Sequence, residues 1–193
     1  KVSGRYMTGD MEKTSRGEIS YGTKKAALLI GGTYRNFGDL IGGDTTGRQT
    51  PSGYKEFAFD AKMKFAIGNK AQLILANNFL QQKNVPVYHK VVLENFSVNE
   101  FDPQQRMLNY AKLDIRGSAA IFKQVAITAS WQQTVEGRNS RKNASTVLRR
   151  EKDEVNTVGF TADVFSTLSK VWTANSGIEL YHDRVGSSRQ DIN

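Results

Sequence analysis

The chain has 193 residues, enough for one domain, with 38% hydrophobic residues and a mean hydropathy of −0.50. Its longest apolar run, Ala26–Ile30, is too short for a membrane-spanning helix, and the lack of cysteine excludes a disulfide scaffold. The net charge is +8, but the cations are spread along the chain instead of gathered beside aromatic residues, which argues against nucleic-acid binding.

The first part of the chain predicts strands separated by turns, without helical periodicity. We expect strands at Val2–Met7, Gly17–Gly22 and Ala26–Phe37. The polar, glycine-rich segment Gly38–Gly53 follows as a long connection.

The next segment, Tyr54–Gln82, has the strictest alternation in the chain. Tyr54–Ile67 and Ala71–Gln82 are predicted to form a hairpin around a turn at Gly68–Lys70. Its first run exceeds the roughly five or six residues of an ordinary strand and reaches the roughly nine to eleven of a tilted membrane strand. One side carries Phe57, Phe59, Ala61, Met63, Phe65 and Ile67, and the other carries Glu56, Asp60, Lys62 and Lys64.

The remainder of the chain predicts two more pairs of strands. Lys83–Gln104 is expected to be a long connection and Glu136–Ser145 a basic one. The strands are expected at Gln105–Arg116, Ile121–Val135, Val147–Phe165 and Val171–Asp183. Because Lys1 is not an initiator and the last residues look like a cut loop, we expect the chain to be an excerpt or a processed form.

The expected connections alternate in length, as they do in outer-membrane barrels, where short turns and long loops lie at opposite ends. We therefore predict an all-β, antiparallel transmembrane β-barrel segment of about eight strands. Three substantial connections favour part of a larger barrel over a closed small one. The apolar residues from Phe57 to Ile67 should face lipid, whereas Asp60, Lys62 and Lys64 should face the lumen.

Six segments, taken in order, resemble the barrel of TonB-dependent outer-membrane receptors. They are Gly4–Tyr6 with Arg16–Gly22, then Gly31–Leu40, Thr50–Tyr54, Asn84–Tyr88 and Pro103–Arg106. Val87 stands where a cation is common in that family. The resemblance is nearest to the haem and iron-siderophore receptors of the Bacteroidetes type.

This resemblance implies that residues 1–193 are the N-terminal part of a plugged barrel of about 22 strands, without its plug, TonB box and C-terminal strands. Such receptors lie in the Gram-negative outer membrane as multi-pass barrels and import a ferric siderophore, haem or a similar nutrient. The implied partners are outer-membrane lipid or lipopolysaccharide, the TonB complex through the plug, and the iron complex or haem. These would be transported ligands and not resident cofactors.

The candidate ligand contacts in the long connections are Tyr88, His89, Arg48 and Arg138. Imidazole and phenolate both bind haem iron, although a lone loop histidine is more often simply solvated. The basic segment Gly137–Asn143 could contact lipopolysaccharide phosphates or steer an anionic ligand.

The spacing of polar residues shows no catalytic set, metal-ligand motif or nucleotide loop, so we expect no enzyme. The alternative function is a soluble β-sandwich or small β-barrel that binds carbohydrate or protein through its loops. That alternative predicts that the apolar side of the Tyr54–Gln82 hairpin is covered by protein.

Overall fold

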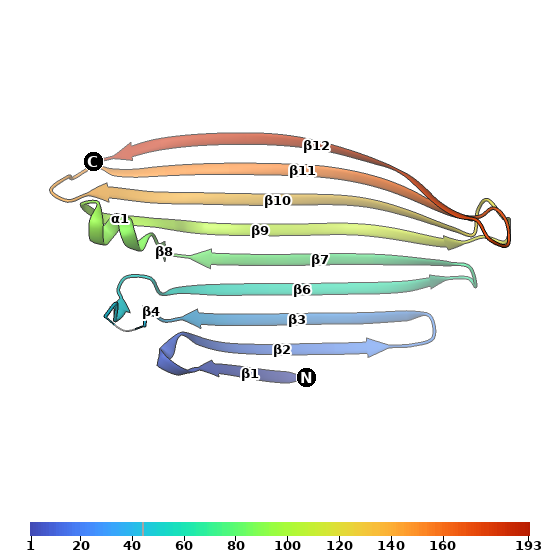
Figure 1. The fold of residues 1–193 in the computed structure, drawn as a ribbon, viewed down its shortest axis with the longest axis horizontal. Coiled ribbons are helices and arrows are strands. Elements are labelled where there is room, and N and C mark those ends of the chain that lie inside the picture. Colours follow the sequence, from blue (N-terminus) through green and yellow to red (C-terminus); the bar gives the residue numbers. More distant parts are fainter. Residues whose placement is uncertain (44) are drawn as a thin grey trace.

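The computed structural model describes residues 1–43 and 45–193, without the side chain of Asp10; Asp44, in the predicted Gly38–Gly53 connection, lies outside the described residues. The chain forms one antiparallel sheet in which successive long strands are neighbours (Figure 1). The strands along this path are β1 (Val2–Met7), β2 (Glu12–Gly22), β3 (Ala26–Phe37), β6 (Tyr54–Ile67), β7 (Ala71–Lys83), β9 (Phe96–Arg116), β10 (Gln124–Lys142), β11 (Leu148–Thr167) and β12 (Thr173–Ile192). The predicted all-β, antiparallel fold class is confirmed.

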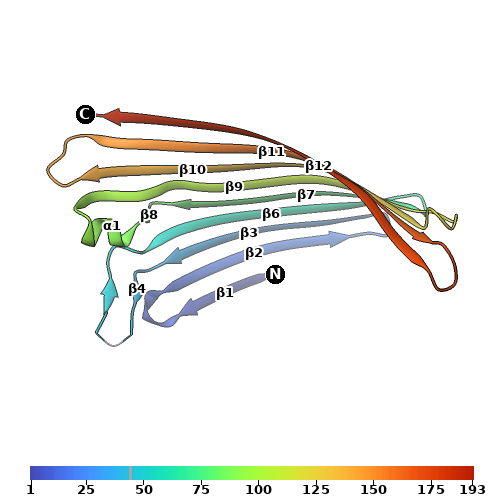
Figure 2. The ribbon, with the colours of Figure 1, turned by 45° about the horizontal axis from the view of Figure 1, so that its top comes forward.

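The sheet is a single curved layer, and its curvature is visible when it is turned (Figure 2). β8 (Val85–Pro86) adds a short tenth strand beside β9, and β4 (Leu40–Ile41) pairs with β5 (Arg48–Gln49) in a separate small hairpin. The outermost strands of the path, β1 and β12, each have one unpaired edge within the described residues. The sheet is therefore open and does not close into a small barrel.

The turns separate into two ends of the sheet (Figure 1). At the short-turn end lie residues 23–25, 68–70, 117–123 and 168–172. The opposite end, which we call the long-connection end, holds residues 38–53 with β4 and β5, and residues 84–95 with β8 and α1 (Tyr88–Leu93). Gly68 has a φ of +62°, which a residue without a Cβ adopts at little cost, so the tight β6–β7 turn forms readily.

Several predicted connections are strands instead. β9 begins at Phe96 and β10 continues to Lys142, so most of the predicted loop Glu136–Ser145 belongs to β10 and only residues 143–147 turn the chain. The C-terminal residues that looked like a cut loop belong to β12. The helix α1 was not expected, because six residues are too few to show a helical period.

Two residues on β9 face one residue on β10 at a bulge near the long-connection end. The register passes from Glu136 opposite Gln104 to Arg138 opposite Phe101, with Gly137 between them. A Cβ on Gly137 would lie 2.3 Å from the carbonyl oxygen of Asp102, so only glycine fits there. The bulge lets the ladder continue far beyond the predicted ends of both strands.

Candidate functional site

The two faces of the sheet differ sharply in polarity. The face that carries Arg16, Glu56 and Asp60 is called the charged face, and the one that carries Phe57 and Met63 the apolar face. Burial is the reverse of that in a water-soluble sheet: Thr33 (3% exposed) and Glu56 (7%) are buried on the charged face, whereas Phe57 is 47% exposed on the apolar face. Among the described residues, Val135 is the one buried hydrophobic side chain, so the sheet has no hydrophobic core.

The apolar residues form a band across the sheet. In β6 the band runs from Phe57 to Ile67, which matches the roughly nine to eleven residues of a tilted membrane strand. Beyond the band, towards the long-connection end, the same face becomes polar. The last apolar residues before this change are Phe57 on β6, Phe79 on β7, Met107 on β9, Trp131 on β10, Val158 on β11 and Leu180 on β12.

The boundary of this band is oblique to the strands. Register partners lead straight across the sheet from Phe57 on β6 to Gly186 on β12, well past Leu180. The boundary therefore shifts by about one residue per strand, and a rise of about 3.3 Å over a strand spacing of about 4.8 Å gives a slope of about 35–40°. Strands of membrane barrels tilt by about 35–45°, so the band is level in a membrane when the strands have that tilt.

Polar side chains inside or beside the band bind one another. The amide of Asn77 donates to the side-chain oxygen of Asn109 at 2.7 Å, and Gln81 donates to Gln105 at 3.0 Å. Each pair is directly opposed in the register of β7 and β9. Such pairing reduces the cost of placing amides on an apolar face.

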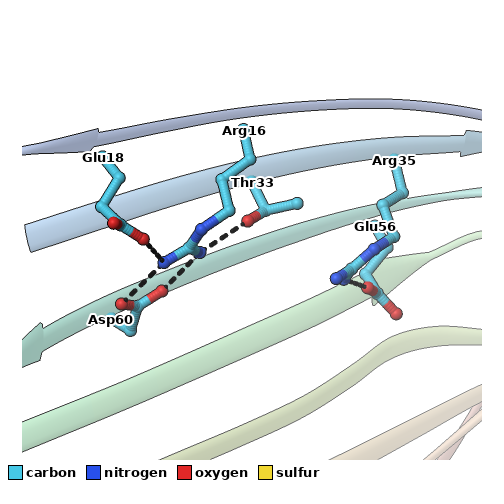
Figure 3. Close-up of polar contacts among 6 residues, drawn as sticks. All are labelled: Arg16, Glu18, Thr33, Arg35, Glu56 and Asp60. Atoms are coloured by element: carbon cyan, nitrogen blue, oxygen red, sulfur yellow. Dashed lines mark hydrogen bonds and ion pairs between the residues drawn. The ribbon is translucent and has the colours of Figure 1, made fainter. Parts of the chain in front are cut away.

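The charged face holds an ion-pair cluster centred on Arg16 of β2 (Figure 3). Its guanidinium donates to both carboxylate oxygens of Asp60 at 2.6 and 3.0 Å, and to Glu18 at 3.1 Å. A further bond of 2.9 Å reaches the hydroxyl of Thr33. Gly31 leaves the space that this guanidinium fills, because a Cβ there would lie 2.3 Å from its Nη2.

A second pair lies on the same face, nearer the long-connection end (Figure 3). Arg35 of β3 donates to Glu56 of β6, and the amide of Gln82 donates to the other carboxylate oxygen of Glu56 at 2.7 Å. The two clusters join β2, β3, β6 and β7 through side chains as well as through the backbone ladder. They also provide hydrogen-bond donors to the carboxylates of Asp60 and Glu56, which the curved sheet partly removes from water.

The charged face of β10–β12 is arranged differently. At the depth of the apolar band it carries the carboxylates of Asp163 and Glu179 among uncharged groups such as Thr128 and Thr161. Charges of both signs lie beyond the band, where they line a cavity of about 350 Å³. The lining residues are Glu136, Arg138, Glu151, Asp153, Ser187, Ser188 and Arg189.

All four predicted ligand residues lie towards the long-connection end (Figure 1). Tyr88 and His89 begin helix α1, and the His89 side chain is 58% exposed, with its Nε2 3.9 Å from a carboxylate oxygen of Glu94. Arg48 lies in the small β4–β5 hairpin and is exposed. No contact joins Arg48 to Tyr88 or His89 within the part of the chain that the structure describes.

Arg138 was predicted to lie in a loop, but it lies in β10. Its guanidinium carbon is 4.8 Å from the ring centre of Phe101, and Nη2 is 3.9 Å from Glu136. A cation over an aromatic face is held in place, so Arg138 is less free to follow a ligand than a loop arginine would be.

The connection between β3 and β6 is ordered by one carboxylate. Asp39 accepts hydrogen bonds from the hydroxyl of Thr50 at 2.6 Å and from the N–H groups of Ser52 and Gly53 at 2.8 and 2.9 Å. These bonds, that of Thr50 above all, hold the pKa of the Asp39 carboxyl below its ordinary value.

The sequence did not reveal the Arg16 cluster, because its members come from three strands. Its signal would have been Glu18, Gly31 and Asp60 in one register row with Arg16 two residues away on the same face of β2, which requires knowing the strand pairing. In the described part of the chain, no three His, Cys, Asp or Glu side chains are grouped so as to hold a metal ion. No helix among the described residues has the length and apolar character needed to cross a membrane.

Comparison with known proteins shows a likeness of fold to a solved structure. No family model matches the chain, and no curated protein matches it. Among solved structures, the chain is similar to one named "Copper transporter OprC", with a TM-score of 0.78 and 10% identity. The likeness covers 97% of this chain and 28% of that chain, so this chain spans less than a third of its length. At this identity the likeness shows the fold alone: an antiparallel sheet like part of that transporter.

These findings correct the assignment made from sequence motifs. The chain was expected to be a TonB-dependent receptor of the haem and iron-siderophore branch, but no family model matches it, and the similar structure is named for copper. That assignment is wrong. The short motifs that suggested it are typical of long antiparallel strands with glycine-rich turns and carry little information about family.

Proposed function

We propose that this chain forms part of the wall of a transport barrel in the outer membrane and is not an enzyme. Its charged face lines the lumen, its apolar face contacts lipid, and its long-connection end lies outside the cell. The same arrangement makes residues 1–193 one section of a larger multi-pass barrel.

The observation that carries this proposal is the inverted polarity of the sheet. Thr33 and Glu56 are buried on the charged face, while aromatic side chains such as Phe57 are exposed on the apolar one. A soluble sandwich, the alternative function, would cover that apolar face with a second sheet. A lipid bilayer instead requires apolar side chains outside and backbone groups paired along the strands. The oblique band, level at the tilt of barrel strands, supports the same arrangement.

The cargo we propose is a metal complex or haem that enters at the long-connection end. The neighbouring structure is named for copper, and Tyr88 and His89 offer a phenol and an imidazole on the exposed helix α1. A complex that brings its own ligands suits this end better than a bare ion, since the described residues form no three-ligand group. Arg48 and Arg138 would attract an anionic complex.

The orientation is tested by labelling single cysteines in the protein that contains this chain, since the chain itself has none. A Ser145→Cys variant, in the β10–β11 turn, should react with a membrane-impermeant maleimide on intact cells. An Asn69→Cys variant, in the β6–β7 turn, should react only after the outer membrane is permeabilised. A Met63→Cys variant should be protected in both cases, because lipid covers it.

Labelling of Met63→Cys by the impermeant reagent in intact cells would contradict a lipid-facing apolar side and favour the soluble alternative. Cells that lack the protein should also take up less of one cargo among copper, a ferric siderophore and haem. If the topology holds but uptake of all three is unchanged, the wall assignment stands and the proposed cargo class is wrong.

A further inference from the structure

A row of three lysines and one asparagine crosses the apolar face just beyond the band, at the long-connection end. Its members are register partners on four consecutive strands of the sheet: Lys13 on β2, Asn36 on β3, Lys55 on β6 and Lys83 on β7. Lys55 follows the same side of β6 as Phe57 and Phe59, so its ammonium leaves the sheet on the apolar face. The three lysines are exposed.

Two of these lysines oppose each other without a counter-charge. Lys55 and Lys83 are direct cross-strand partners, which places their Cβ atoms about 4.5–5.5 Å apart. Within residues 1–43 and 45–193, neither ammonium has an ion pair or a side-chain hydrogen bond. Like charges directly opposite each other destabilise a sheet. The nearest carboxylate along β6, Glu56, points to the charged face and is bound to Arg35 and Gln82.

The row lies where a lipid changes from hydrocarbon to headgroup. Tyr34 and Phe57, themselves register partners, end the apolar band on β3 and β6, and Asn36 and Lys55 are the next residues on that face. On β7 the band ends at Phe79, and Gln81 and then Lys83 are the next residues on the same face. An acyl chain covering Phe57 would therefore carry its headgroup to the level of the lysines.

We propose that Lys55 and Lys83, with Asn36 beside them, form a binding site for the phosphate of an anionic lipid in the leaflet at the long-connection end. This inference rests on the proposed membrane location of the apolar face. One phosphate between the two ammonium groups removes their repulsion, and the Asn36 amide donates a further hydrogen bond. Lys13 extends the row, although the proposal does not depend on it.

A lipid phosphate suits this site better than a free anion because the site lies on an open strand face and does not enclose a ligand. The lysines extend from an exposed strand face, and the adjacent surface is the apolar band, so a ligand with acyl chains gains contacts that inorganic phosphate lacks. The site thus recognises charge and hydrocarbon together.

The test uses the full protein, solubilised in an uncharged detergent, and the double variant Lys55→Gln/Lys83→Gln. Added phosphatidylglycerol should bind the wild-type protein more tightly than phosphatidylcholine does, as measured by native mass spectrometry. The double variant should bind phosphatidylglycerol about tenfold more weakly, since each lysine near a membrane surface contributes to anionic-lipid attraction. The matched control, Lys62→Gln/Lys64→Gln, removes the same charge from the charged face of β6 and should bind phosphatidylglycerol as the wild type does.

A second measurement separates lipid binding from a purely structural role. Without anionic lipid, the Lys55→Gln/Lys83→Gln variant should unfold at the same temperature as the wild type or a higher one, because repulsion is relieved. With phosphatidylglycerol, the wild type should gain more stability than the variant. Equal lipid binding by both proteins, an equal loss in the control, or equal stabilisation by inorganic phosphate would each overturn the proposal. The cysteine-labelling topology remains the separate test of the membrane location.

Discussion

The strands before residue 84 and those after residue 95 cross the same apolar band but differ greatly in length. β2, β3, β6 and β7 have 11 to 14 residues, whereas β9, β10, β11 and β12 have 19 to 21. The extra residues of the second group lie beyond the band at the long-connection end (Figure 1). At about 3.3 Å per residue and the slope of the band, they would extend the sheet well past the hydrocarbon layer of the proposed membrane.

The difference shows that the alternation of polar and apolar residues, and not strand length, locates the apolar band. In β12 the apolar face carries Ile178 and Leu180 within the band and then His182, Arg184 and Ser188. Charges are also placed differently across the sheet. Arg16 and Asp60 pair at the depth of the band, as do Lys112 and Asp114 of β9. The ion pairs of β10–β12, such as Arg149 with Asp191, lie in the extension.

The largest expected effect comes from charges placed within the band. Met63→Lys on β6 and Ile178→Lys on β12 should each destabilise the full protein by about 2–4 kcal/mol, because both positions face the bilayer interior. Ser188→Lys, on the same face of β12 but in the extension, should cost about 0–1 kcal/mol. Chemical unfolding in lipid vesicles, followed by tryptophan fluorescence, measures all three values. A cost for Ser188→Lys equal to that for Ile178→Lys would mean that the membrane covers the whole of β12.

A smaller effect separates the ion pairs of the two groups. Arg16→Met leaves Asp60 and Glu18 without their cation in a cluster whose Arg16 and Asp60 side chains are 29% and 26% exposed, so it should lower the stability more. Arg149→Met breaks a pair whose side chains are 41% and 43% exposed and screened by water, so it should lower the stability less. The same unfolding assay compares them. Adding Asp60→Asn to Arg16→Met should recover part of the loss; no recovery would show that the loss comes from packing and not from charge.

The two groups also differ in how far the sequence alone predicted them. The bounds of Val2–Met7, Ala26–Phe37 and Tyr54–Ile67 were predicted correctly, since alternation marks a strand that has one apolar face. The start of β11 was predicted to within one residue, but the ends of β9, β10 and β12 beyond the band were taken for loops, because both faces are largely polar there. The apolar face was visible in the sequence, but the Arg16–Asp60 pair depends on the register between β3 and β6, which a long connection separates. The local sequence pattern does not determine that register. The Lys55–Lys83 pair belongs to the β6–β7 hairpin, whose register follows from its short turn.

The smallest expected effect concerns the connection at residues 38–53, where the first group has a capped loop in place of extended strands. Asp39 accepts bonds from Thr50, Ser52 and Gly53, and these bonds lower the pKa of its carboxyl below the ordinary value of 3.8. The pKa of Asp39 is lower in the folded loop than in the unfolded chain. The ionised carboxylate therefore stabilises the loop fully above about pH 4, and this stabilisation is lost as the pH falls through the pKa of the folded loop. A spin label at Thr45→Cys should therefore gain mobility only at pH values below 3.8.

The variant Asp39→Asn and a second label position make this prediction specific to the carboxylate. With Asp39→Asn, the label at residue 45 should be mobile at every pH, because an amide accepts these three bonds less well than a carboxylate does. A label at Ser145→Cys, in the turn between β10 and β11, should not respond to pH in this range, since the backbone ladder of two long strands holds that turn. If both labels respond alike, acid loosens the whole long-connection end, and the contrast between a capped loop and an extended sheet is lost.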